Sequence, residues 1–213
     1  AEHVARDAAP FFEAPLHSYL GLGAGWSTAA NTPFRLHKSW THEGGISTPL
    51  IVHWPRLIKS QNALRHTPAH VIDVVPTILE LAGVTKPQEW QGTPVPPAPG
   101  KSLVAAFAND ATIERESLWW LHEGNRAVRQ GKWKLVAQFK GPWELYHIDD
   151  NRTEQQDIIG KFPALSQHLI RQWEDWAATT FVDEWIGEVR NDWGEEPQRE
   201  GALKKQAKAG KRG

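Results

Sequence analysis

No cysteine and no methionine occur among the 213 residues of the chain. Without a thiol, neither a disulfide framework nor a thiolate metal site can form. No stretch approaches the roughly 20 apolar residues that a membrane-spanning helix needs. Neither sign of charge is in excess, because 24 Lys and Arg residues balance 25 Asp and Glu residues. The sequence therefore predicts no membrane partner and no nucleic-acid partner, since both attract chains with a strong basic excess.

The chain also begins without a methionine and without the basic-then-apolar segment of a secretory signal. We therefore expect it to be a piece of a longer protein. Its hydrophobic fraction of 40% is typical of a globular chain. Its length allows one sizeable domain or two small ones.

The most informative segment is Asn31–Pro55, which surrounds Lys38. The lysine precedes a carboxylate, Glu43, and a pair of glycines, Gly44 and Gly45. Glycines allow a close approach of the backbone, so the pair predicts a tight structural turn beside a ligand, with Glu43 anchoring the turn. The alternative is that Lys38 is a solvated loop lysine paired with Glu43, because most lysines are exposed.

An apolar run follows the glycine pair. Pro49 suits the start of a strand, and the β-favouring residues after it predict a strand over about 49–54. Ligands of open α/β folds bind at the edge of the sheet. The position of Lys38 just before this strand therefore indicates a binding site for an anion.

The rest of the first half predicts helices joined by irregular segments. Residues 1–35 lack periodicity and predict a long loop. Asp73 and Gly83 are typical of a helix N-cap and a C-terminal stop. A proline-rich connection over 84–100 precedes a short helix that Ser102 can cap. The apolar residues of the first helix recur at helical spacing and should face a sheet; they are Val75, Ile78, Leu79 and Ala82.

The second half predicts a small antiparallel sheet covered by one helix. The expected strands are 117–122, 126–129, 133–139 and 143–148. Pro163 suits the start of a helix that runs to about Thr179. Its apolar stripe should cover one face of the sheet, and consists of Leu165, Leu169, Ile170, Trp173 and Trp176.

The lysine segment and this order of elements together resemble the C-terminal part of the arylsulfatase-type sulfatases, in the alkaline phosphatase superfamily. The resemblance covers about residues 26–182. It implies an α/β, alkaline phosphatase-like fold that is incomplete here. Residues 1–110 would be the remainder of the α/β sulfatase domain, 111–186 a small antiparallel β subdomain with its helix, and 187–213 a flexible basic tail.

The resemblance also implies a sulfuric ester hydrolase that uses calcium and a formylglycine. Formylglycine is made in a Cys/Ser-x-Pro-x-Arg motif, which this sequence lacks, since the segment Asn31–Arg35 has asparagine in the first place. The Asp and Asn ligands of calcium are likewise not found together. Both groups would lie upstream, and we expect no metal ligand in this chain and no activity of the chain alone. The family is usually exported, which implies a periplasmic or secreted protein.

Residue by residue, the resemblance transfers one catalytic role, to Lys38. Its ammonium group would hold the sulfate oxygens of a small-molecule or glycan sulfate ester. Three histidines, His37, His42 and His17, could line the substrate pocket. Arg35 could face the same side, but a structural salt bridge is the expected role.

Two other functions fit the same sequence. A phosphonate or phosphodiester hydrolase of the same superfamily would also hold a tetrahedral anion with a cation. Twelve tryptophans allow a non-catalytic carbohydrate-binding module, with Trp119 and Trp120 as a stacking platform. Adjacent strand residues point to opposite faces, however, so at least one of these two should lie in the core.

Overall fold

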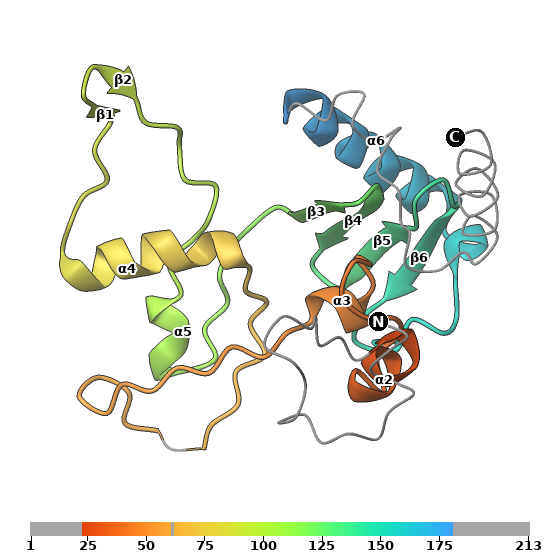
Figure 1. Cartoon of the computed structure of the whole chain (residues 1–213), viewed down its shortest axis with the longest axis horizontal. Helices are drawn as coiled ribbons and strands as arrows, with labels where there is room; N and C mark the ends of the chain where they lie inside the picture. The colour runs from red at the N-terminus through yellow and green to blue at the C-terminus, as the bar shows by residue number, and fades with distance from the viewer. Residues whose placement is uncertain (1–22, 61, 181–213) are drawn as a thin grey trace, which may run out of the picture. The chain divides into compact units, whose positions relative to one another are not determined.

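The computed structural model describes residues 23–60 and 62–180 (Figure 1). The chain separates into two compact units, one of Ala1–Thr48 with Trp119–Gly213 and one of Pro49–Leu118. None of the described helices is long and apolar enough to cross a membrane. The tail expected at 187–213 and most of the loop expected at 1–35 lie outside the described residues.

The first unit is built on a four-stranded sheet in the order β3-β4-β5-β6. Its strands confirm the expected antiparallel half of the sequence. β4 pairs antiparallel with β5, and β5 pairs antiparallel with β6. The strands are β3 (Leu118–His122), β4 (Asn125–Gln130), β5 (Trp133–Ala137) and β6 (Trp143–His147).

Helix α6 (Pro163–Thr179) covers one face of this sheet, as its apolar stripe predicts. Proline in the first turn loses no hydrogen bond, because the first amides of a helix have no partner within it. Leu169 and Trp173 are buried, and the rest of the stripe packs around them. The buried residues of this core are Val128, Leu135, Leu145, Leu169, Trp173 and Ala177.

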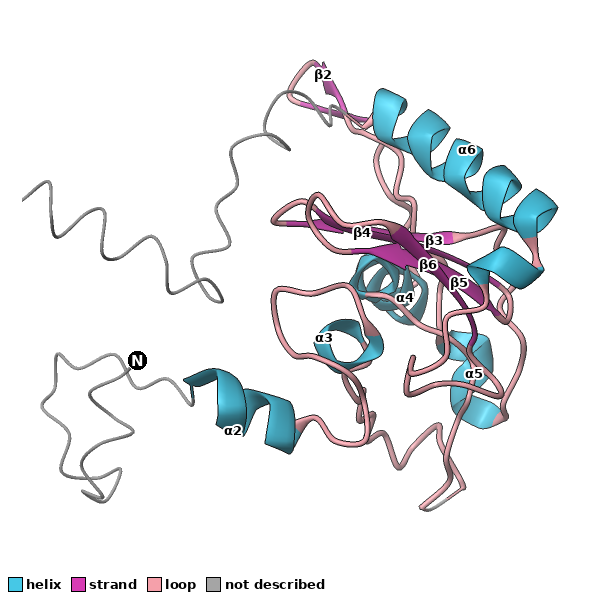
Figure 2. Ribbon diagram, turned by 90° about the vertical axis from the view of Figure 1, so that its right-hand side faces the viewer, coloured by secondary structure: helices cyan, strands magenta, loops and turns pink. Residues whose placement is uncertain are grey.

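The opposite face of the sheet lies under the lysine segment, which we define as residues 31–48. Figure 2 shows α6 on one side of the sheet and the short helix α3 (Glu43–Ile46) on the other. We expected the lysine segment to belong to a domain ending near residue 110. In the structure the lysine segment groups with the sheet of the first unit. The domain boundary expected near residue 110 stays a prediction for the whole protein.

Helix α2 (Gly23–Ala30) replaces the end of the long loop expected over 1–35. The loop prediction is wrong for these residues because α2 has no buried residue and therefore no apolar periodicity to reveal it. Local hydrogen bonds support the helix instead. Thr28 Oγ1 donates to the Ala24 carbonyl at 2.9 Å, and Asn31 Nδ2 donates to the Ser27 carbonyl at 2.6 Å.

The second unit contains the helices predicted on either side of the proline-rich connection. A 3-10 turn, η1 (Val71–Asp73), leads into α4 (Val74–Ala82), which ends at Gly83 with a left-handed φ of 63°. α5 spans Val104–Ala108. A small hairpin of β1 (Glu89–Trp90) and β2 (Thr93–Pro94) lies within the proline-rich connection.

Helix α4 begins directly after Asp73, as predicted, but the 3-10 turn η1 precedes it. His70 is the N-cap of η1, and the Asp73 side chain completes the capping box by accepting from the His70 amide at 2.8 Å. Asp73 is fully buried and also accepts from the Lys101 amide and from Arg115. Its side chain therefore joins three segments of the unit and makes no capping hydrogen bond to α4.

Two expectations about apolar residues are wrong for the described structure. Residues 49–54 form no strand, and Ile51 is 89% exposed. A strand needs a neighbour to bond its amides and carbonyls, and no described strand pairs with this run. The α4 residues Val75 and Ile78, expected to face a sheet, are more than half exposed, because the only sheet described in this unit is the small β1–β2 hairpin.

Candidate functional site

Lys38 lies in a tight turn at the tip of the lysine segment. The Trp40 amide donates to the His37 carbonyl at 3.2 Å, which closes a turn with Lys38 and Ser39 in its centre. Ser39 has a φ of 92°, the sign that a type II turn requires at its third residue. We call residues 37–40 the lysine turn. Lys38 is exposed, and among the described residues its ammonium makes no hydrogen bond or ion pair.

The glycine pair lets helix α3 approach the backbone of this turn. The Gly44 amide donates to the Arg35 carbonyl at 3.0 Å. A Cβ atom on Gly44 would overlap the carbonyl oxygens of Arg35 and Leu36, and one on Gly45 would overlap that of Trp40. Neither glycine has a positive φ. The pair is thus required for close packing of the lysine segment on itself, which any larger side chain would prevent.

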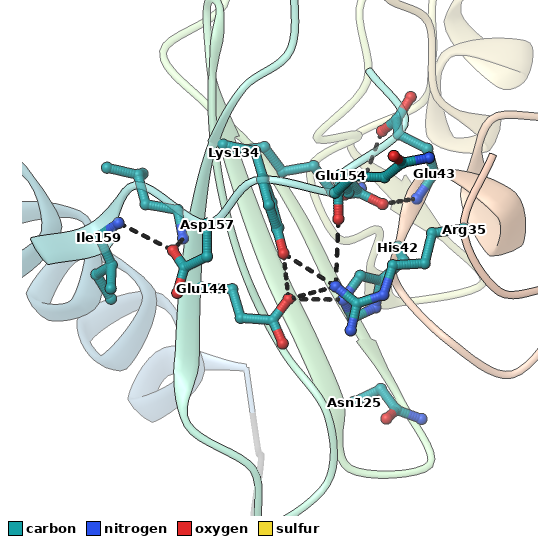
Figure 3. Close-up of polar contacts among 12 residues, drawn as sticks. Arg35, His42, Glu43, Asn125, Lys134, Glu144, Glu154, Asp157 and Ile159 are labelled. Atoms are coloured by element: carbon teal, nitrogen blue, oxygen red, sulfur yellow. Dashed lines mark hydrogen bonds and ion pairs between the residues drawn. The ribbon is translucent and has the colours of Figure 1, made fainter. Parts of the chain in front are cut away.

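A carboxylate on β6, Glu144, binds the base of the lysine segment (Figure 3). Its Oε2 atom lies 2.8 Å from Arg35 Nη1 and 3.3 Å from His42 Nε2, and it accepts from the Tyr146 hydroxyl. Burial alone would raise the pKa of Glu144, but the hydrogen bonds from His42, Tyr146 and Arg35 outweigh it and lower the pKa to about 2. Burial and the bond to Glu144 raise the pKa of the Tyr146 hydroxyl.

A buried lysine on β5, Lys134, binds helix α3 (Figure 3). Its Nζ atom lies 2.9 Å from Glu43 Oε1 and 2.8 Å from Glu154 Oε1, and all three side chains are at most 3% exposed. The Glu43 amide donates to Glu154 Oε2 at 2.7 Å. Burial opposes ionisation of Glu43, but the charge and hydrogen bond of Lys134 hold its pKa below the usual value. We call Glu43, Lys134 and Glu154 the buried ion triad.

Two further side chains of the first unit reach the lysine segment. Asn125, at the start of β4, donates through Nδ2 to the Ser39 carbonyl at 2.8 Å. Arg152 donates to Ser47 Oγ at 2.8 Å and lies 3.5 Å from Glu43 Oε2. The polar face of the sheet thus holds the lysine segment at its base, at helix α3 and beside Lys38 itself.

The expected site residues lie at different depths. Lys38 is exposed and His37 is half-buried, with its Nδ1 atom 3.3 Å from Thr28 Oγ1 and its ring against Trp40. His42 is fully buried and turned toward Glu144, so it contributes to the base of the segment. Glu43 pairs with Lys134 rather than with Lys38. His17 lies outside the described residues.

Residues that hold the segment and were not anticipated from the sequence include Asn125, Lys134, Glu144, Arg152 and Glu154. A signal for Lys134 exists, because it interrupts the apolar run Trp133–Ala137. A strand with so few polar residues is buried on both faces, and a lysine buried there needs an ionic partner. Arg35 does form the structural salt bridge that we expected.

No group of His, Asp or Glu side chains suited to a metal ion occurs within residues 23–60 and 62–180. The sequence also offers no cysteine from which a formylglycine could be made. The described arrangement is therefore an exposed cation on a turn whose backbone is held by the sheet. It can bind an anion and stabilise developing negative charge, but supplies no nucleophile of its own.

Comparison with known proteins identifies the class of this chain. A family model described as N-sulphoglucosamine sulphohydrolase, C-terminal, matches residues 34–175. An uncharacterized sulfatase of Schizosaccharomyces pombe is 32% identical over 173 residues, which are 78% of this chain and 31% of that protein. A sulfatase of Formosa agariphila is 25% identical over 162 residues, which are 68% of this chain and 29% of that protein.

The fold is also found in solved structures. The crystal structure of Ps i-CgsB in complex with k-i-k-neocarrahexaose superimposes with a TM-score of 0.57 at 24% identity, and the match covers 83% of this chain and 37% of that one. The class is thus the alkaline phosphatase-like fold. The chain belongs to the sulfatase family and corresponds to its C-terminal portion. It spans about a third of the length of the sulfatases that it matches.

Proposed function

We propose that the whole protein hydrolyses a sulfate ester and that Lys38 contacts the sulfate group. The observation that carries this proposal is an exposed ammonium group with no described partner, held on a tight turn inside the segment that matches the sulfatase family. A lysine that contacts only solvent would not require contacts that hold the backbone around it. The contacts of Glu144, Lys134 and Asn125 instead hold the backbone on both sides of it.

The role of Lys38 follows from its chemistry. An ammonium group offers three hydrogen-bond donors and a full positive charge. Placed against a sulfate group, it would orient the ester and stabilise the charge that develops on the leaving oxygen. A donor that is fixed before the reaction contributes about 3–4 kcal/mol, or roughly 10²–10³ in rate. A formylglycine nucleophile and a calcium ion, which the family resemblance implies, would come from other residues than the described ones.

The exposed apolar residues of the second unit support the proposal that this chain is part of a larger folded protein. Val71, Val75 and Ile78 on η1 and α4 are each more than half exposed, as are Leu50 and Ile51. Exposed apolar clusters of this kind mark interaction surfaces. We propose that strands and helices of the larger sulfatase domain, in the rest of the protein, bury these residues. On this basis the isolated chain is inactive.

We further propose that the ester belongs to a sulfated sugar. The matched family model takes its description from a sugar derivative, N-sulphoglucosamine. The crystal structure of Ps i-CgsB contains a bound neocarrahexaose, an oligosaccharide. Export to the periplasm or the medium, where such substrates occur, is the localisation that accompanies this proposal.

A carbohydrate-binding module has less support. Trp119 stacks on Trp176 with ring centres 5.6 Å apart, in the core under α6. Trp120 packs on the opposite side, against the cluster that includes Ala127 and Tyr146. The pair therefore forms no single open platform for a sugar ring.

The experiment is a turnover assay of the whole protein with and without Lys38→Ala. We expect kcat/KM for a sulfate ester to fall about 100- to 1,000-fold, because a fixed cation is lost at developing charge. The matched control is Lys132→Ala, which removes an exposed lysine from the turn between β4 and β5. Unchanged turnover in Lys38→Ala would refute the assigned role. Faster turnover of a phosphonate ester or a phosphodiester than of a sulfate ester would favour the related hydrolase.

A further inference from the structure

The lysine turn adopts a conformation that its own residues do not favour. Ser39, inside the turn, has a φ of 92°, and Leu36, just before the turn, has a φ of 66°; both values are uncommon for residues with a side chain. The third position of a type II turn favours glycine for this reason. Such conformations persist only where the surrounding structure imposes them. At Ser39, a contact from outside the turn must therefore stabilise the conformation.

That contact comes from Asn125. Its side chain is buried, with a residue exposure of 1%. Nδ2 donates to the Ser39 carbonyl at 2.8 Å, and Oδ1 accepts from the Phe139 amide at 3.0 Å. Because both ends of the amide group are bonded, the side chain is fixed relative to the sheet. Its hydrogen bond therefore fixes the peptide group that joins Ser39 to Trp40, one residue after Lys38.

The remaining supports of the segment act further from the lysine. Glu144 binds Arg35 and His42, which lie three and four residues from Lys38. The buried ion triad binds helix α3, which begins five residues after Lys38. Asn125 is the residue of the sheet that bonds directly to a neighbour of Lys38 in the described structure.

We propose that Asn125 is a positioning residue for Lys38. By holding the Ser39 carbonyl, it fixes the direction in which the lysine turn presents the ammonium group to the sulfate ester. Asn125 itself does not touch the substrate. This inference rests on the proposed function of Lys38, because the position of the ammonium group affects turnover only if that group binds the sulfate ester.

The test is a double-mutant cycle in the whole protein, with Lys38→Ala and Asn125→Asp. Aspartate keeps an oxygen that accepts from the Phe139 amide but has no donor for the Ser39 carbonyl. It therefore removes the contact to the turn and replaces it with a buried carboxylate oxygen facing that carbonyl. Since small displacements of a reacting group are costly, we expect Asn125→Asp to lower kcat roughly tenfold. In the Lys38→Ala background, the same change should have almost no effect, because the group that it positions is gone.

A rescue experiment separates positioning from general damage. Glycine adopts a positive φ without strain, so Ser39→Gly favours the observed turn even without the asparagine. We expect Ser39→Gly to restore part of the turnover that Asn125→Asp loses. A merely structural role of Asn125 predicts no such recovery. Leu169→Val on the α6 face is the control for lost stability, and it should leave turnover unchanged at temperatures where it is folded.

Three results would overturn the inference. Full turnover of folded Asn125→Asp would do so, as would equal losses in both lysine backgrounds or failure of the rescue. If Asn125→Asp does not fold, Ser39→Pro takes its place in the cycle, since proline excludes a φ of 92°; equal losses with and without Lys38 again overturn the inference. Wild-type turnover in Lys38→Ala is a distinguishable result, because it removes the proposed function itself.

Discussion

The two faces of the four-stranded sheet are covered by different chemistry. Under α6 the contacts are apolar, with Leu135, Leu145 and Leu169 fully buried. Under the lysine segment, ionic contacts through the buried ion triad and Glu144 lie beside a smaller apolar cluster that includes Ala127 and Val136. Apolar packing tolerates substitutions that keep volume and pattern. Buried ion pairs fix one arrangement and penalise every other, so the ionic face is suited to hold a loop that must present one group.

The largest effect should follow from removing the cation of the ionic face. Lys134→Met leaves Glu154 buried without a positive partner and leaves Glu43 with its longer contact to Arg152 at 3.5 Å. We expect a loss of about 3–5 kcal/mol in the free energy of unfolding of the whole protein, measured by chemical denaturation, together with a loss of turnover because the lysine segment is released.

A triple variant sharpens this prediction. Lys134→Met combined with Glu43→Gln and Glu154→Gln removes all three charges and should recover most of the stability. It should not recover turnover to the same extent, since the specific pairing is gone. If Lys134→Met is as stable as the wild type, the triad does not hold the segment and the comparison of the two faces fails.

A slightly smaller effect is expected on the apolar face. Leu169→Ala opens a cavity between α6 and the sheet, next to Leu135 and Trp173. Substitutions of this kind cost about 2–5 kcal/mol. Because the cavity lies on the far side of the sheet from the lysine turn, kcat of the folded variant should stay near the wild-type value. A selective loss of kcat without loss of stability would show that the two faces are not separate.

The smallest effect is a pH dependence confined to the ionic face. Glu144 has a pKa lowered from 4.5 to about 2 by its bonds to His42, Tyr146 and Arg35, against the effect of burial. A lowered pKa means that folding favours the ionised form. The stabilisation is therefore complete above about pH 4.5 and is lost as the pH falls toward 2.

Glu144→Gln should remove this part of the acid sensitivity, as measured by denaturant midpoints across that pH range. The matched control is Glu174→Gln, the same change at an exposed position on α6. An equal reduction of acid sensitivity in both variants would contradict the assignment to Glu144.

The apolar face could be predicted from the sequence, and the ionic face could not. The stripe of α6 and the alternation of the strands are local patterns, and they predicted the strands, the helix bounds and their contact. The ionic pairs join residues that are far apart in the chain, such as Arg35 with Glu144 at a separation of 109 residues and Glu43 with Lys134 at 91. No local pattern connects such partners.

The failed predictions have related causes. The strand expected at 49–54 and the sheet expected under α4 both require a neighbour, and the pattern of a segment does not say where its neighbour is. The glycine pair, expected in a tight turn beside a ligand, lies in helix α3, and its close contact is with the carbonyls of Leu36 and Trp40. The role of Lys38 stays a prediction that rests on the matched segment and on its held, exposed position.

The most direct test of the role of Lys38 is a crystal structure of the whole protein with a bound sulfate ester or inorganic sulfate at the reaction site. We predict that Lys38 Nζ lies about 3 Å from a sulfate oxygen, with Asn125 still bonded to the Ser39 carbonyl. A sulfate group bound at the nucleophile while the Lys38 ammonium lies beyond hydrogen-bonding reach would contradict this prediction.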